Sequence, residues 1–171
     1  MSSLPPPLFA PWRMDYIRCI DKGPAECFLC AAGNLPADAT VERKKELLVL
    51  WRSEHCVVLV NRYPYTNGHL LIAPLAHKAE LEDLSDAELI DLTRQTAAAV
   101  QLLKRAISPQ GFNVGINLGR AAGAGVPGHL HQHVVPRWNG DTNFMSVVGE
   151  CRVVPQAMSQ LWDELVREVG G

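Results

Sequence analysis

The sequence predicts an α+β domain in which helices cover an antiparallel sheet of five strands. Several short runs of branched and aliphatic residues are separated by turn-forming residues, as in antiparallel strands. Two longer stretches instead carry residues at helical spacing, as on one face of an amphipathic helix. The chain has 171 residues, 47% of them hydrophobic and 20% charged, which is enough to bury one core without disulfides. We therefore expect residues 1–171 to form a single domain.

The first elements along the chain are an arm and three strands. Residues 1–25 contain the proline-rich stretch LPPPLFAPW, which favours an extended arm. Apolar runs bounded by charged or Asn-Gly turns predict strands at 47–51, 56–61 and 68–74. His69 lies at the start of the third run, where we expect a packed side chain without a chemical role.

A change of period after the third strand predicts a long helix over 85–107. Ser85 and Glu88 have the spacing of a capping box, and Ser108-Pro109 ends the helix. The residues expected on its core-facing side are Leu89, Thr93, Thr96, Val100, Leu103 and Ile107.

Strand-like alternation returns at 112–119 and 128–135, which completes the sheet. A C-terminal helix is predicted over 155–169, with Pro155 in its first turn and Gly170 after its last.

The composition excludes several classes of partner. A net charge of -2 and a pI of about 6.3 predict no general basic surface for nucleic acid. The apolar runs are much shorter than the roughly 20 residues of a membrane-spanning helix, so we expect no membrane association. Five cysteines cannot all pair within one chain, and the N-terminus lacks the pattern of a secretion signal. We therefore expect a cytoplasmic protein.

Three of the six histidines, His129, His131 and His133, occupy alternate positions of the last predicted strand. In a strand they share one face, where a neutral imidazole can attack an electrophile or the three rings can bind a metal ion. The preceding segment 119–128 is rich in glycine and offers backbone N–H groups to an anion. No acidic residue lies in this segment or in the histidine strand to complete a catalytic metal shell. We favour a nucleophilic histidine beside a phosphate, and keep a catalytic metal as the alternative.

Cys27 and Cys30, in the stretch CFLC, have the spacing that lets two thiolates reach one tetrahedral zinc ion. One such pair is only half a site. A redox pair and two buried cysteines are therefore alternative interpretations.

The chain resembles the histidine triad (HIT) family. HLHQHVV matches the family pattern His-x-His-x-His followed by two apolar residues. FAPWRMDYI, CFLC, NGHLLIAPLAH and AGAGVPGHLHQHVVPRWNGDTNFM occur in the order found in diadenosine tetraphosphate phosphorylases and hydrolases, so the similarity covers residues 8–148. It implies a HIT-like fold, a homodimer, and cleavage of a purine nucleotide or dinucleoside polyphosphate without an organic cofactor. A phosphoramidase and a non-catalytic nucleotide sensor are the alternatives.

The resemblance also implies roles for the three histidines and for four nearby residues. His131 would attack the α-phosphorus and form a nucleotidyl-histidine, His133 would donate to a phosphate oxygen, and His129 would complete the triad. The implied nucleotide or phosphate contacts are Asn117, Gly125, Val126 and Asn61. Judged by position alone, Asn117 is equally a turn-facing amide and Asn61 a strand-end cap.

Relatives that share the cysteine pair complete a zinc site with two histidines. The matching positions are His77 and His129, so the resemblance implies a structural zinc held by Cys27, Cys30, His77 and His129. Two departures from the family pattern concern the phosphate site. The second intervening position of the triad, usually apolar, is Gln132, and Gly125-Val126 replaces a pair that in many relatives donates side-chain hydrogen bonds. Phosphate contacts there are expected from the backbone alone.

Overall fold

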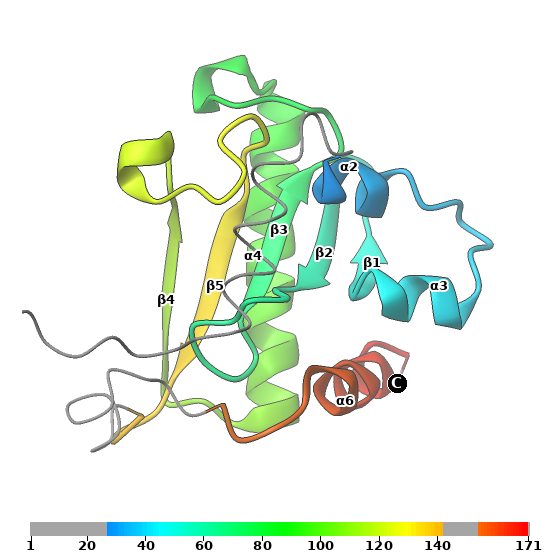
Figure 1. The fold of residues 1–171 in the computed structure, drawn as a ribbon, viewed down its shortest axis with the longest axis vertical. Helices are drawn as coiled ribbons and strands as arrows, with labels where there is room; N and C mark the ends of the chain where they lie inside the picture. The colour runs from blue at the N-terminus through cyan, green and yellow to red at the C-terminus, as the bar shows by residue number, and fades with distance from the viewer. Residues whose placement is uncertain (1–26, 142–153, 171) are drawn as a thin grey trace, which may run out of the picture.

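A computed structural model describes residues 27–141 and 154–170. The arm predicted for residues 1–25 lies outside them. Five strands form one antiparallel sheet in the order β1-β2-β3-β5-β4, which confirms the predicted class (Figure 1). The strands are β1 Val49–Arg52, β2 Cys56–Val60, β3 Leu70–Pro74, β4 Gly111–Ile116 and β5 Gln132–Arg137.

The two faces of the sheet carry different helices. The long helix α4, Asp86–Ile107, and the C-terminal helix α6, Met158–Val169, pack in one hydrophobic cluster with one face of the sheet. The short helix α2, Phe28–Gly33, packs on the other face and precedes α3, Val41–Glu46. Figure 1 shows α4 running behind β3 and β5. The histidines lie on the α2 side, as described below.

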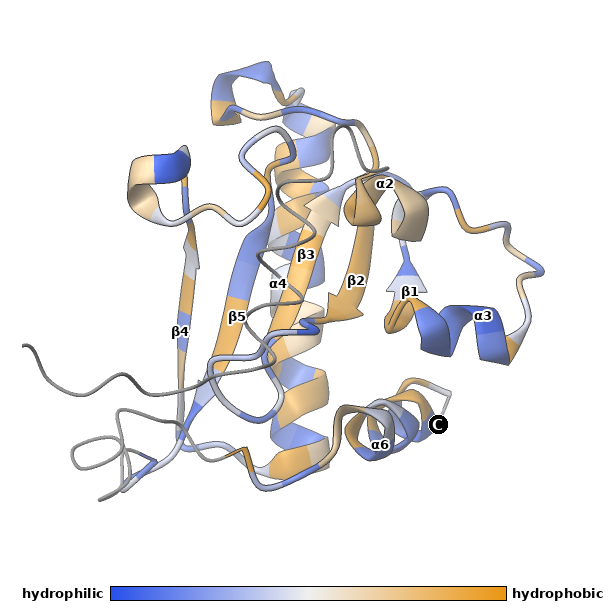
Figure 2. Cartoon of the chain, in the orientation of Figure 1, coloured by the Kyte–Doolittle hydropathy of each residue, from blue (hydrophilic) through white to orange (hydrophobic). Residues whose placement is uncertain are grey.

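The central strands have two buried faces. Val58 and Val60 of β2 belong to the α4 cluster, whereas Val57 and Leu59 belong to the α2 cluster. Side chains alternate along a strand, so a sheet covered on both sides requires a continuous apolar run. Figure 2 shows this run as the continuous hydrophobic colour of β2 and β3.

Helix α4 begins and ends as predicted, and most of its predicted core-facing residues pack against the core, although the most buried positions are displaced by about one residue. Ser85 and Glu88 form the capping box, and Ser108 ends the helix in the left-handed conformation. The buried residues are Glu88, Leu92, Ala99, Leu102 and Leu103. Of the residues expected to face the core, Leu103 is buried, Leu89, Val100 and Ile107 are partly buried against the same cluster, and Thr93 is exposed. The alanines around position 98 gave no hydropathy contrast that would have fixed the rotation of the helix.

The helices differ from the predictions in two ways. Helices α2 and α3 were missed because six residues are too few for a helical period to appear in the sequence. Helix α6 begins at Met158, with Ala157 as its N-cap, rather than at Pro155, although Gly170 caps its end as expected.

The strand predicted at 128–135 begins only at Gln132. Its ladder with β3 ends at Ile72, before Pro74, which has no N–H to donate. The carbonyl of Pro74 instead accepts a hydrogen bond from the His129 ring, at 2.9 Å. His129 and His131 therefore precede the strand, and the three histidines do not form one straight row.

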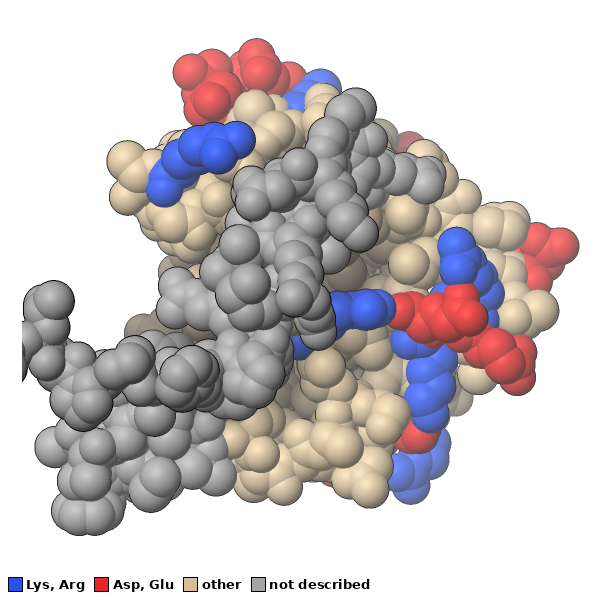
Figure 3. Space-filling model, viewed as in Figure 1, with Lys and Arg blue, Asp and Glu red and all other residues tan. Residues whose placement is uncertain are grey.

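Charge is mixed on the face seen in Figure 3, where lysines, arginines and acidic residues gather over α3. Arg43 pairs with Glu46 at 2.6 Å, and Lys45 pairs with Asp163 of α6 at 2.5 Å. Within the described ranges, no helix is long and apolar enough to cross a bilayer.

Candidate active site and metal cluster

Two neighbouring histidines, His131 and His133, meet His69, which lies 64 residues before His133 in the sequence, on the α2 side of the sheet. His133 in β5 pairs with Leu71 of β3, and His69 lies two residues before Leu71 on the same face. The rings of His69 and His133 lie 5.1 Å apart, and those of His131 and His133 lie 5.0 Å apart. His69 is fully buried and His131 nearly so.

The tautomer of His131 follows from its contact with the main chain. Its Nδ1 lies 2.8 Å from the carbonyl oxygen of His129, which can only accept, so Nδ1 carries the proton. The lone pair of the neutral ring is then on Nε2. Burial lowers the pKa of His131 below its ordinary value, which keeps the ring neutral and nucleophilic near pH 7.

A chain of hydrogen bonds also fixes His133. The main-chain N–H of Tyr65 donates to Nδ1 of His69 at 3.1 Å, so Nε2 of His69 carries the proton. That proton points to Nδ1 of His133, 2.9 Å away. His133 consequently presents an Nε2–H donor. Burial, followed by the neighbouring imidazoles, lowers the pKa of His69 to about 3 and that of His133 to about 4.

The two predicted asparagine contacts are placed differently. Asn117 follows β4, and its side-chain amide lies 3.4 Å from Nε2 of His133, beside the donor that would meet a phosphate. Asn61 follows β2, and its Oδ1 accepts from the N–H of Tyr63 at 3.0 Å. Its Nδ2 lies 3.1 Å from Nδ1 of His69. In this structure Asn61 therefore caps the strand end and supports His69.

The glycine-rich loop leads directly into the histidines. The N–H of His129 donates to the carbonyl of Val126 at 3.2 Å, which forms a turn just before the triad. Gly125 is exposed and Val126 packs partly against the α2 cluster. Neither residue has a side-chain donor, so an anion bound there could be held only by main-chain N–H groups.

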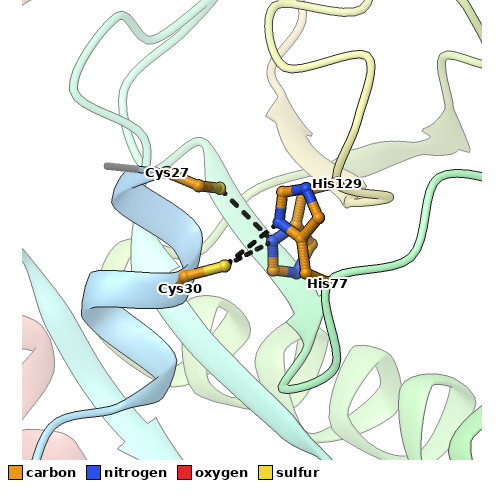
Figure 4. Close-up of side chains that lie close together, drawn as sticks. All are labelled: Cys27, Cys30, His77 and His129. Carbon is orange, nitrogen blue, oxygen red and sulfur yellow. Dashed lines mark hydrogen bonds between the residues drawn. The ribbon is translucent and has the colours of Figure 1, made fainter. Parts of the chain in front are cut away.

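A second group of side chains lies beside the histidines (Figure 4). Cys27 and Cys30, at the start of α2, face His77 and His129, and one ligand atom from each lies within 4.8 Å of the others. The Sγ atom of Cys30 is 3.1 Å from Nδ1 of His77 and 3.4 Å from Nδ1 of His129. The Sγ atom of Cys27 is 3.3 Å from the same His129 atom.

The donor set fits a tetrahedral ion. Around zinc, a sulfur and a nitrogen ligand lie about 3.6 Å apart, close to the separations between the cysteines and histidines here. Nε2 of His129 donates to Pro74, which leaves Nδ1 for a metal, the arrangement expected of a metal-binding histidine. Burial raises the pKa of the Cys27 thiol, but the hydrogen bond and charge interaction with His129, together with the main-chain hydrogen bonds of Cys30 and Leu29, outweigh burial and lower the pKa to about 6. A thiolate is the form that binds metal.

His129 connects the two groups. Its ring belongs to the Cys-His cluster, whereas its carbonyl oxygen orients His131. The sequence placed all three histidines on one surface; the structure instead directs the first toward the cysteines and the other two toward each other.

Two residues of the site were missed by the sequence analysis. His69 was expected to be only a packed residue, yet it donates to His133. Tyr65 stacks on both rings, with its ring centroid 4.7 Å from that of His69 and 5.8 Å from that of His133. The one available signal was the position of His69, which alternates with the apolar residues Leu71 and Ala73 and so faces the same side.

Comparisons with known proteins find relatives of this chain. The family model described as HIT domain matches residues 42–140. AP-4-A phosphorylase of Mycobacterium tuberculosis is 39% identical over 155 residues, which cover 88% of this chain and 77% of that protein. The asymmetrical bis(5'-nucleosyl)-tetraphosphatase of Schizosaccharomyces pombe is 34% identical over 93 residues, 54% of this chain and 50% of that protein.

A solved structure has the same fold. The Zn-bound histidine triad family protein from Mycobacterium smegmatis superposes with a TM-score of 0.64 at 24% identity, covering 85% of this chain and 94% of that one.

Proposed function

The chain belongs to the HIT family, and on that premise we propose that it is an enzyme that cleaves dinucleoside polyphosphates at the α-phosphate. One observation carries the proposal: the His129 carbonyl holds the proton of His131 on Nδ1, which leaves the Nε2 lone pair for attack. Two relatives whose names state this chemistry support the substrate class.

The reaction would proceed in two steps. Nε2 of His131 attacks the α-phosphorus, the bond from that phosphorus to the bridging oxygen breaks, and the remaining nucleoside polyphosphate leaves with the bonding electrons. Water or orthophosphate then attacks the nucleotidyl-histidine and restores the free imidazole. The Nε2–H of His133 and the amide of Asn117 donate to the phosphate oxygens as negative charge develops.

The loop supplies the other donors in this proposal. The main-chain N–H groups of Gly125 and Val126 bind the phosphate in place of the side-chain hydroxyl or amide found in many relatives. In the same proposal, Asn61 lies near the ribose of the bound nucleotide, where its side chain caps the loop that follows β2.

We further propose that the metal is a structural zinc held by Cys27, Cys30, His77 and His129. When bound, the ion cross-links α2 to the segment that precedes β5. Because His129 is one of the proposed ligands, its carbonyl oxygen is then held in place beside Nδ1 of His131. The support is the separation of the ligand atoms and the hydrogen bond from His129 to Pro74.

The remaining proposals concern the whole chain. We propose a single HIT domain over residues 1–171, located in the cytoplasm, where a thiol such as that of the buried Cys56 stays reduced. We also propose a homodimer. Among the described residues, β4 pairs with β5 alone, so its outer edge is open to a second chain.

The proposed function is tested by identifying the products that the protein forms from diadenosine tetraphosphate. The protein is incubated with this substrate, with and without orthophosphate, and the nucleotides are separated by chromatography. ATP with ADP would indicate phosphorolysis, and ATP with AMP would indicate hydrolysis. No turnover of this substrate or of an adenosine phosphoramidate would contradict the proposal and favour a nucleotide sensor. Trapping the adduct on a residue other than His131 would contradict the mechanism.

Metal analysis of protein purified without chelator tests the zinc. We expect about one zinc per chain in the wild type and a clear loss in Cys30→Ser. The matched control is Cys56→Ala, which removes a buried cysteine outside the cluster and should keep the zinc. A content near zero in the wild type would remove the zinc proposal.

A further inference from the structure

We propose that Tyr65 is a positioning residue of this enzyme, whose ring shields the hydrogen bond between His69 and His133 from water and thereby fixes the tautomer of His133. The inference rests on the proposed function for its kinetic part. Its structural part concerns the protein without substrate and can be tested separately.

The rings of Tyr65, His69 and His133 lie close together. The centroid of the Tyr65 ring lies 4.7 Å from that of His69, at an interplanar angle of 34°, and 5.8 Å from that of His133, at 21°. The two imidazoles are themselves 5.1 Å apart. The tyrosine ring therefore lies against both imidazoles of the hydrogen-bonded pair.

Tyr65, His69 and His133 differ in how far their side chains are exposed to solvent. His69 has no exposed surface and His133 is partly buried, whereas Tyr65 is 41% exposed. Tyr65 is thus the outer member of the group. A hydrogen bond kept away from water is stronger, and water at the same place would compete for both imidazole nitrogens.

The main chain of Tyr65 also contributes to the placement of the proton on His69. The N–H of Tyr65 donates to Nδ1 of His69, and this contact determines which nitrogen of His69 carries a proton. Stacking of the ring holds the loop between β2 and β3 in the position that directs this N–H. Both parts of Tyr65 thus favour the same outcome, an Nε2–H on His133 directed at the phosphate.

The test combines kinetics with histidine NMR on the full chain as purified. Tyr65→Leu removes the ring but keeps the main-chain N–H, and Tyr65→Phe keeps the ring. Tyr63→Leu is the matched control, because Tyr63 lies in the same loop and is 43% exposed. Kinetics use diadenosine tetraphosphate, and long-range proton–nitrogen spectra report the tautomers of His69 and His133 without substrate.

We expect Tyr65→Leu to lower kcat at least about tenfold while KM changes by less than about threefold, since an orienting group and not a substrate contact is lost. Its His133 spectrum should move toward a mixture of tautomers. Tyr65→Phe should keep the wild-type tautomer pattern because the ring remains, and Tyr63→Leu should resemble the wild type in both measurements. If Tyr65→Leu unfolds, Tyr65→Gln serves as the second variant without the ring.

Three results would overturn the inference. One is a wild-type tautomer pattern in the variants without the ring. Another is a rise in KM at unchanged kcat, which would identify a substrate contact. The third is a change of tautomer without a fall in kcat. If the wild type cleaves no substrate, the proposed function fails, and the tautomer spectra alone decide the role of Tyr65.

Discussion

At the scale of single residues, the chemistry of this site depends on which ring nitrogen carries each proton. An isolated imidazole exchanges readily between its two neutral tautomers. Here a main-chain carbonyl selects one tautomer for His131, and a main-chain N–H, acting through His69, selects one for His133. Two adjacent histidines therefore offer opposite functions, a lone pair on one and a proton on the other.

Replacement of the proposed nucleophile tests this assignment. We expect His131→Ala to lower kcat by at least about 10³-fold, because the only bond-forming group is lost. Nucleotide affinity, measured by calorimetry with AMP, should stay within about tenfold of the wild type. His55→Ala, which removes a histidine outside the site, serves as the control. Wild-type activity in His131→Ala would refute the assignment.

At the scale of elements, the N-terminus of α4 is tied to the loop that carries His77. Glu88 accepts hydrogen bonds from Lys78 Nζ at 2.7 Å and from the Ser85 N–H at 2.7 Å. The N–H of Leu130 donates to the Lys78 carbonyl at 2.7 Å. One carboxylate thus links α4, through Lys78, to both segments that contribute histidines to the Cys-His cluster.

This link predicts a pH dependence of stability. The hydrogen bond from Lys78, then those from Ser85, lower the pKa of Glu88 from 4.5 to about 2. Because the pKa is lower in the folded state, the stabilisation is complete above pH 4.5 and is lost as the pH falls toward 2. Glu88→Gln should reduce the free energy of unfolding by about 1–3 kcal/mol at pH 7 and flatten its decrease in acid.

Urea denaturation at several pH values between 7 and 3 measures this effect. Asp86→Asn, which removes an exposed acidic residue from the same helix turn, should retain the wild-type slope. Parallel curves for the wild type and Glu88→Gln would contradict the prediction.

The turn before β3 contains a glycine whose replacement should destabilise the fold. Gly68 has a φ of +78°, and a Cβ atom added there would lie 2.5 Å from Cδ1 of Ile107. Gly68→Ala should therefore lower the free energy of unfolding by about 1–3 kcal/mol. Gly111→Ala, with open space around the added atom and no positive φ, should change it by less than about 0.5 kcal/mol. Equal effects of the two changes in thermal denaturation would contradict this explanation.

At the scale of the whole molecule, the edge of β4 that pairs with no other strand of residues 27–141 and 154–170 is the feature that predicts an assembly. Val114 in this strand is 47% exposed. Val114→Lys should convert the dimer to a monomer, because a lysine on an edge strand opposes pairing with another chain. Light scattering should give twice the chain mass of 18.8 kDa for the wild type and a single chain mass for the variant. Val41→Lys, at a 61% exposed site on α3, is the control. A monomeric wild type would refute the dimer.

The sequence by itself determined the class of the fold, the five strands, both ends of α4 and the family, because period, caps and motifs are properties of neighbouring residues. The family resemblance named Cys27, Cys30, His77 and His129 as a set, although only the structure brings Cys27 and His129 within 3.3 Å. Tertiary structure alone decided which positions of α4 are fully buried, the departure of His129 from the strand, and the contacts of His69 and Tyr65 with His133. Each of these depends on contacts between residues far apart in the chain, and such contacts leave no periodic signal in a single sequence.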